Sequence, residues 1–250
     1  MAATKVTERL KAQKPRSPYE HHHRDIQGGA ARAAVFGVSD GLVSNVSLIL
    51  GLAGATPSAS IIRLAGVAGL LGGAFSMAAG EYISMRAQKE LFQREIEIER
   101  REIERHPTSE HRELVHLYET RGVPAELARK LADEMMSNPE LALETHAREE
   151  LGVNPDSLGQ PLQAAASSFV TFAAGAVVPL IPFFAGGGSG AVVVAVVITA
   201  VAALVVGGLL SLFTGRPWWW SSLRQLLICA VAGAATFGIG HAIGVSGVAG

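Results

Sequence analysis

The sequence predicts an all-α polytopic membrane protein with five transmembrane helices and a cytoplasmic helical insert between the second and third spans. Hydrophobic residues make up 49% of the 250 residues, and they come in long blocks that contain few charges. One membrane crossing needs about 20 mostly apolar residues. Five stretches meet this requirement, and they are Ala33–Ala55, Ile61–Met85, Leu162–Ala185, Ala191–Phe213 and Leu223–Val248.

The acidic residues are concentrated in one part of the chain, which the net charge of −1 conceals. All but five of the 22 acidic residues lie between residues 86 and 156. This segment is therefore expected to be in water. The predicted organisation is a tail over residues 1–32, two spans over 33–85, a helical insert over 86–157 that continues the second span, and three spans over 158–250.

The basic residues predict which side of the membrane each part occupies. Residues 1–32 carry seven Lys or Arg, so the positive-inside rule places this tail and the insert in the cytoplasm. The uncharged loop Ala185–Gly190 is then outside, the loop Gly215–Arg224 with its two arginines is inside, and the C-terminus is outside. The tail has no apolar core that would make it a cleavable signal, and His21–His23 are interpreted as part of a solvated tail.

The first span contains an acidic residue, Asp40, in the stretch GVSDGLVSN. An ionised carboxylate at membrane depth costs about 2.5–3.5 kcal/mol, so Asp40 needs a partner, a cavity or a proton. Gly37 and Gly41 permit another helix to approach closely. The alternative interpretation is that Asp40 only joins helices through a polar contact.

The second span has small residues at every fourth position, including Gly69 and Gly73, and the series ends at Met77. Close packing of this seam on the first span would bring Asp40 near Met77 and Glu81. A buried methionine is ordinarily a core residue, but Met77 lies one turn before an acidic residue in the membrane. Carboxylates alone suit Mg²⁺, Ca²⁺ or Mn²⁺, and an added thioether shifts the preference toward Fe²⁺.

No proline or glycine interrupts the chain between Gly80 and Arg105, so the second span is expected to continue as one helix into water. At 100° per residue, polar side chains fall within roughly 40° of the line through Met77. A cation path from solvent into the membrane requires such a polar face. Its members are Glu81, Ser84, Gln88, Glu95, Glu99 and Glu102.

The rest of the insert is predicted to form three more helices. The first helix stops at Pro107, the second begins with Thr108 or Ser109 as N-cap and runs to Gly122, the third runs from Pro124 to Ser137, and the fourth runs from Pro139 to Gly152.

Acidic residues of the insert recur with a spacing of one helical turn. Such pairs resemble the carboxylate sites of di-iron bundles, whereas the alternative is a solvated face paired with neighbouring arginines. The candidate ligands are Glu99 with Glu102, Glu110 with Glu113, and His146 with Glu150. The lone Cys229 excludes a cysteine-based metal site.

Three stretches together resemble the vacuolar iron transporter family, which includes the plant nodulin-like members. They are GGAARAAVFGVSDGLVSNVSLILGLAGA, SMAAGEYISMRAQKEL and the acidic insert that ends in THAREELGV. The resemblance implies a five-span homodimer that exchanges cytosolic Fe²⁺ or Mn²⁺ for protons. Zn²⁺ and Co²⁺ are further candidate ions. It also implies that Asp40 and Met77 line the translocation site beside Glu81, and that the insert binds metal through Glu99, Glu102, Glu110, Glu113 and Glu150.

The resemblance has one departure: eukaryotic members carry methionines before the last of these glutamates, where this chain has His146 and Ala147. The ending AREELGV resembles bacterial members, which favours a plasma membrane over a vacuole.

The leading hypothesis is therefore a proton-coupled Fe²⁺ and Mn²⁺ exporter. Its expected partners are metal ions, protons, the lipid bilayer and a second copy of the chain, with no nucleic acid and no prosthetic group. One alternative is an enzyme, a membrane-anchored di-iron ferroxidase, or an iron-storage protein. A third interpretation makes the insert an acidic docking module, but it leaves Asp40 unexplained.

Overall fold

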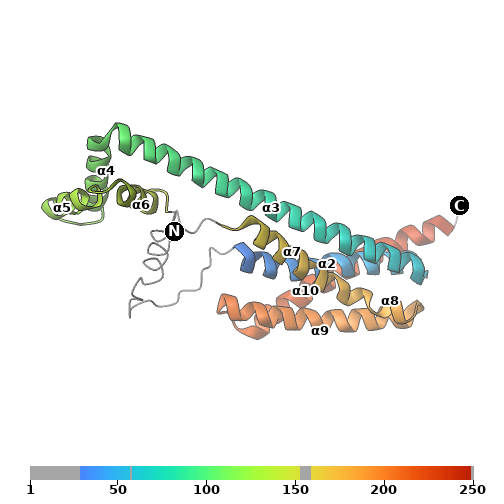
Figure 1. Ribbon diagram of the computed structural model, residues 1–250. Coiled ribbons are helices and arrows are strands. Elements are labelled where there is room, and N and C mark those ends of the chain that lie inside the picture. Colours follow the sequence, from blue (N-terminus) through green and yellow to red (C-terminus); the bar gives the residue numbers. More distant parts are fainter. Residues whose placement is uncertain (1–28, 57, 153–158, 249–250) are drawn as a thin grey trace, which may run out of the picture.

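The computed structural model describes residues 29–56, 58–152 and 159–248, and every regular element in these ranges is a helix (Figure 1). Five helices are long and apolar enough to cross a membrane. They are α2 (Gly29–Ala55), α3 (Ala59–Arg105), α7 (Pro161–Val177), α9 (Gly188–Thr214) and α10 (Trp218–Val248). The predicted fold class is confirmed. Most of the predicted N-terminal tail, including His21–His23, lies outside the described residues.

The third span is shorter as an α-helix than the sequence predicts. Helix α7 ends at Val177, a 3₁₀ turn η2 (Val178–Leu180) follows, and α8 (Pro182–Ala185) completes the segment. Pro179 lies in this turn and Pro182 begins α8. Proline lacks the backbone N–H that a continuous helix needs, and its ring clashes with the preceding turn.

Helix α2 is the centre of the membrane bundle, since it packs against α3, α7, α9 and α10. The predicted close approach at its glycines is made by α7: a side chain at Gly41 would collide with the Phe172 carbonyl. The glycines of α3 face other side chains, because Gly69 lies against Leu48 and Gly73 against the Phe172 ring. The two glycine seams therefore do not pack on each other, contrary to the prediction from the sequence. Each one instead fits a different neighbour.

Helix α3 connects the membrane bundle to the insert (Figure 1). Its 47 residues would span about 70 Å at 1.5 Å per residue, whereas a bilayer core is about 30 Å thick. The apolar part ends near Met85, so the acidic part from there to Arg105 extends beyond the membrane core. The predicted continuity of this helix is confirmed, because α3 runs from Ala59 to Arg105 without a break.

The insert folds back on the end of α3 through α4 (Pro107–Thr120), α5 (Ala125–Met135) and α6 (Pro139–Glu149). The corner lies at His106, whose φ of −130° and ψ of 46° leave the helical region before Pro107. The predicted N-cap of α4 at Thr108 or Ser109 is wrong: Pro107 occupies the first turn and His106 is the N-cap. Proline is favoured there because its missing N–H has no partner at a helix start.

A small apolar cluster fixes α6 against α3. Ile103 of α3 packs with Ala142 and Leu143 of α6, and Ile96 and Met136 lie at the edge of this cluster. The side chain of Asn138 caps α6 by accepting hydrogen bonds from the N–H groups of Glu140 and Leu141. These contacts determine which side chains of α3 and α6 face each other.

Candidate metal centre

Three helices of the insert each turn one polar side chain toward the same point. On α3, Glu99 lies between Ile96 and Ile103 on the face that packs against α6. On α4, Glu110 lies one turn before Leu114, which is fully buried. Each polar side chain therefore shares a helix face with apolar residues of the insert core, and packing of that core carries it inward.

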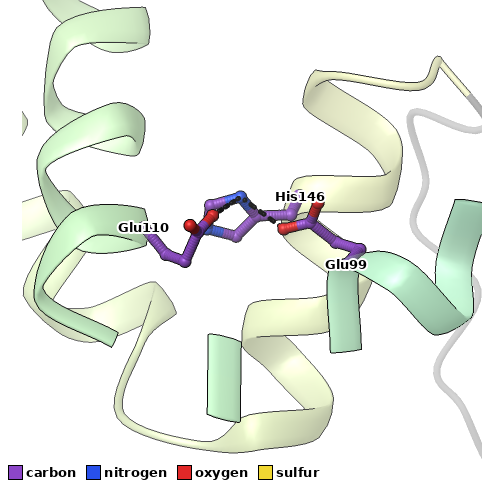
Figure 2. Close-up of side chains that lie close together, drawn as sticks. All are labelled: Glu99, Glu110 and His146. Carbon is purple, nitrogen blue, oxygen red and sulfur yellow. Dashed lines mark ion pairs between the residues drawn. The ribbon is translucent and has the colours of Figure 1, made fainter. Parts of the chain in front are cut away.

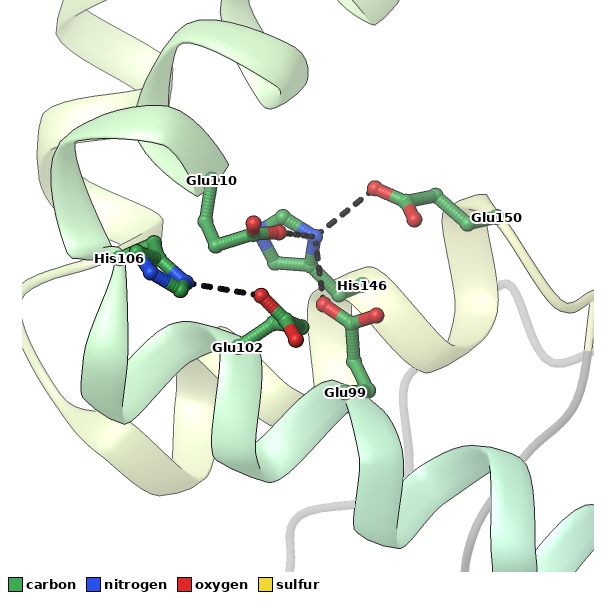
Figure 3. Close-up of polar contacts among 6 residues, drawn as sticks. All are labelled: Glu99, Glu102, His106, Glu110, His146 and Glu150. Carbon is green, nitrogen blue, oxygen red and sulfur yellow. Dashed lines mark hydrogen bonds and ion pairs between the residues drawn. The ribbon is translucent and has the colours of Figure 1, made fainter.

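His146 of α6 is the centre of this arrangement, with no exposed surface. Its Nδ1 lies 2.8 Å from Oε1 of Glu150, 3.1 Å from Oε1 of Glu99 and 3.9 Å from Oε2 of Glu110 (Figure 3). Glu99 and Glu110 approach the imidazole from two sides (Figure 2). The ligand atoms of Glu99, Glu110 and His146 all lie within 4.8 Å of one another, a spacing that can hold a metal ion.

The cluster has more negative groups than its neighbours can balance. One imidazole nitrogen cannot satisfy three carboxylates at once, and His146 Nε2 is buried without a hydrogen-bond partner. Within residues 58–152, no Lys or Arg forms an ion pair with Glu99, Glu110 or Glu150. Buried carboxylates are stable only when paired, protonated or bound to a cation. The geometry therefore fits a site for a positive ion.

Other acids of the same helices behave differently, which separates the two interpretations of the acidic insert. Glu97 pairs with Arg101 at 3.1 Å across one helical turn and is half exposed. Glu149, next to Glu150 in sequence, pairs with Arg121 of α4. A solvated, salt-bridged face is thus the correct description for these acids. It does not describe Glu99, Glu110 and Glu150, which converge on the imidazole of His146.

The proton affinity of the cluster is shifted upward. This part of α3 lies beyond the membrane core, and burial there, with repulsion from Glu150, raises the pKa of Glu99 to about 7, against a smaller opposing effect of His146. Burial, with repulsion from Glu113, also raises the pKa of Glu110. Near neutral pH the cluster therefore holds a proton that a divalent cation can displace.

Two predicted ligands lie outside this group. Glu102 Oε2 is 2.9 Å from Nδ1 of His106 at the α3–α4 corner, and both side chains are largely exposed (Figure 3). Glu113 is exposed and repels Glu110 and Glu99 electrostatically. Sequence reasoning did not single out His106, although its position four residues after Glu102 placed it on the same helix face.

The predicted residues of the membrane region lie in a second polar region. Asp40 and Met77 line one cavity of about 310 Å³ between α2, α3 and α7. The sequence places Ser44 on the same helix face as Asp40, and Ser44 lines this cavity. Sequence reasoning did not single out Asn45 or Ser76, although Asn45 ends the motif GVSDGLVSN. The full lining is Asp40, Ser44, Asn45, Leu48, Gly69, Gly73, Ser76, Met77 and Phe172.

Glu81 is not among the residues that line this cavity. Its Oε1 lies 2.9 Å from Nη2 of Arg32 in the first turns of α2, and the Glu81 side chain is 16% exposed. This contact joins α2 to α3 at the end of the cavity nearer the insert. The sequence alone indicated only that Arg32 belongs to the basic tail, and it did not predict Glu81 as a partner of Arg32.

Comparison with known proteins gives a consistent result. A sequence profile described as the VIT family matches residues 31–241. The chain is 31% identical to vacuolar iron transporter 1 of Oryza sativa subsp. japonica over 238 residues, which cover 94% of each chain. It is 33% identical to a vacuolar iron transporter of Centaurea cyanus over 88% of this chain and 89% of that one. It is also 37% identical to a vacuolar iron transporter of Acanthamoeba castellanii, over 64% of this chain and 58% of that one.

Proposed function

This chain belongs to the VIT family, and we propose from that premise that it transports Fe²⁺, and also Mn²⁺, out of the cytosol in exchange for protons. It is a multi-pass integral membrane protein. The observation that carries the proposal is the cluster around His146, where carboxylates from three helices converge without a Lys or Arg among their ion pairs in residues 58–152.

The cluster of the insert captures the ion. Glu99, Glu110 and Glu150 supply oxygen ligands and His146 supplies a nitrogen ligand. Imidazole suits first-row ions such as Fe²⁺, while carboxylates also suit Mn²⁺. The exposed acids Glu102 and Glu113 extend the negative surface around the site and attract the cation before it binds.

The ion then passes through the membrane by way of Asp40 and Met77. Met77 and Glu99 lie on the same helix and are about 33 Å apart at 1.5 Å per residue, so one ion cannot contact both stations. Five spans are few for a complete pathway in one protomer. We therefore infer that two copies of the chain form a homodimer whose first two spans face each other across the path.

Exchange for protons follows from the ligands. A carboxylate must release its proton before it binds a metal ion, so metal and proton compete for Asp40 and for Glu99. On the cytosolic side a carboxylate releases its proton and binds the metal ion. On the opposite side a proton binds the carboxylate and displaces the metal ion. A proton gradient can thereby drive the metal in the opposite direction. We place the protein in a bacterial plasma membrane, with the insert in the cytoplasm.

The test uses the full chain in liposomes with the insert facing outward. A pH gradient with the more acidic solution inside the liposomes should drive uptake of Fe²⁺ or Mn²⁺, and Asp40→Ala should abolish this uptake. Uptake that does not depend on the pH gradient, or that Asp40→Ala leaves unchanged, would contradict proton-coupled transport through Asp40. A ferroxidase is the less favoured function, because the relatives compared above are named as transporters.

A further inference from the structure

Asn45 is a buried amide in the same membrane cavity as Asp40 and Met77. It lies five residues after Asp40 on α2, its side chain is 2% exposed, and it lines the cavity. At 1.5 Å per residue it is about 7.5 Å farther along the helix axis, away from the insert. The cavity thus has two polar levels, Asp40 with Met77 at the first and Asn45 at the second.

The orientation of the Asn45 amide follows from its hydrogen bond. The Nδ2 group donates to the carbonyl oxygen of Ala176 on α7. A carbonyl only accepts, so the NH₂ group must face α7 and Oδ1 must point elsewhere. Oδ1 is buried and has no hydrogen-bond partner. An amide oxygen without a partner is costly at membrane depth, where water does not compensate for it.

Helix α3 packs against this oxygen with a glycine. The residue opposite is Gly69, and a Cβ atom there would come within 3.2 Å of Asn45 Oδ1. Gly69 also lines the cavity, two turns along α3 from Met77. The same Cβ atom would come within 2.5 Å of Leu48 Cδ2, so only a glycine fits beside this oxygen and the Leu48 side chain. Leu48 also lines the cavity.

We propose that the carboxamide oxygen of Asn45 contacts the metal ion during transport, as the next station beyond Asp40 and Met77. This inference rests on the proposed function. A transported cation needs oxygen ligands to replace its water. A neutral amide oxygen supplies one without a second charge in the membrane.

A neutral ligand also lets the ion move on. Passage requires sites that bind the ion strongly enough to admit it and weakly enough to release it. The Asp40 carboxylate provides the stronger attraction, and Asn45 draws the ion away from it toward the side opposite the insert. As a hard oxygen ligand, Asn45 also favours Mn²⁺ and Fe²⁺ over soft ions such as Cd²⁺.

The amide has two halves that variants can separate, since its donor joins α2 to α7 and its acceptor lies beside Gly69 of α3. Asn45→Met replaces the oxygen with a soft thioether, and Asn45→Asp keeps an oxygen while removing the NH₂ group. Ser47→Ala is the matched control, because the Ser47 hydroxyl donates to Val43 of its own helix and does not line the cavity.

The experiment measures Mn²⁺ and Cd²⁺ uptake by the full chain in liposomes under the same pH gradient. Asn45→Met should raise the ratio of Cd²⁺ to Mn²⁺ uptake about tenfold, because the site becomes softer. Asn45→Asp should keep the ratio within about twofold of wild type, because a hard oxygen remains. Ser47→Ala should change neither rate. If Asn45→Met does not fold, Asn45→Cys gives the same contrast.

The outcomes separate this inference from the proposed function. An equal fall in Mn²⁺ and Cd²⁺ uptake in Asn45→Met would mean that Asn45 only joins helices. Unchanged uptake rates would mean that Asn45 has no role in transport. Either result overturns the inference alone. In both cases the wild type still transports metal and Asp40→Ala still abolishes transport. A wild type that moves neither metal overturns the proposed function as well.

Discussion

The insert cluster around His146 and the membrane cavity at Asp40 differ in the number of carboxylates that they contain. The cluster brings Glu99, Glu110 and Glu150 to one imidazole. The cavity has one carboxylate and otherwise offers a thioether, an amide and hydroxyl groups. Several carboxylates can gather near water because their desolvation is partial. At membrane depth each additional charge costs about 2.5–3.5 kcal/mol.

This difference indicates a division of tasks between the two regions. A site rich in carboxylates binds a divalent ion tightly and suits capture at low concentration. A site with one carboxylate and neutral ligands binds less tightly and suits passage, because the ion must leave again. Helix α3 connects the two regions, since it carries both Met77 and Glu99 on one continuous rod (Figure 1).

Removing the single charge of the cavity should have the largest effect. Asp40→Asn keeps the shape of the side chain but removes the charge that attracts the ion into the membrane. The transport rate should fall by about 100-fold, which corresponds to about 2.8 kcal/mol. Metal affinity of the insert, measured by titration calorimetry on the same protein, should not change. A parallel loss of insert affinity would show that the two regions are one site.

Removing one charge from the cluster should have a smaller effect on a different quantity. Glu99→Gln should weaken metal binding by about 10–100-fold, at least as much as loss of a group that supports a ligand. The KM for transport should rise, while the rate at saturating metal should stay close to wild type. Glu97→Gln is the control, because Glu97 lies on the same helix but pairs with Arg101. Complete loss of transport in Glu99→Gln would contradict the division of tasks.

The sequence was sufficient for the membrane fold and for much of the cluster. Apolar length predicts the spans, and one-turn spacing brought Glu99, Glu110, His146 and Glu150 into consideration. Spacing did not predict which acid of each pair faces inward, because Glu99 and Glu102 differ by only about 60° around the helix. Packing of Ile96 and Ile103 against α6 decides that choice. Glu102 instead contacts His106, which follows it by one helical turn at the end of α3.

The membrane cavity was harder to predict in detail. The glycines of α2 and α3 correctly indicated close helix packing, but their pattern does not say which helix approaches. The structure pairs Gly41 with α7 and leaves Gly69 opposite Leu48 and Asn45. The role of an amide depends on where its NH₂ group finds an acceptor, and for Asn45 that acceptor lies 131 residues away on α7. Local sequence patterns do not contain such long-range contacts.

Metal binding by the insert cluster should depend on pH through the carboxyl group of Glu99. The pKa of Glu99 is raised to about 7, so below that pH a metal ion must displace its proton. Affinity should rise about tenfold per pH unit up to about pH 7 and then level off. Glu99→Gln should flatten this dependence, which titrations at several pH values would reveal. A wild-type affinity that is constant between pH 5 and 7 would contradict the assigned proton.

The same shift has a consequence for the metal-free protein. In the unfolded chain the Glu99 carboxyl ionises near the ordinary glutamate pKa of 4.5, whereas in the folded protein it holds its proton to about pH 7. Between these values the folded state binds more protons, so the stability of the metal-free insert should fall as the pH rises. Metal should restore that stability above pH 7. Thermal unfolding with and without Mn²⁺ checks both statements.

The smallest effect is expected at the ion pair between Arg32 and Glu81, which lies between the two regions. Arg32 is 69% exposed on its side chain, and such pairs contribute at most about 1 kcal/mol, or about fivefold in a rate. Arg32→Gln frees the Glu81 carboxylate to attract a cation, so uptake at low metal concentration should rise by up to about fivefold. Adding Glu81→Gln should remove that gain. If Arg32→Gln and Glu81→Gln, made separately, instead reduce uptake equally, the pair only fastens α2 to α3, and the ion reaches Asp40 from the cluster without contacting Glu81.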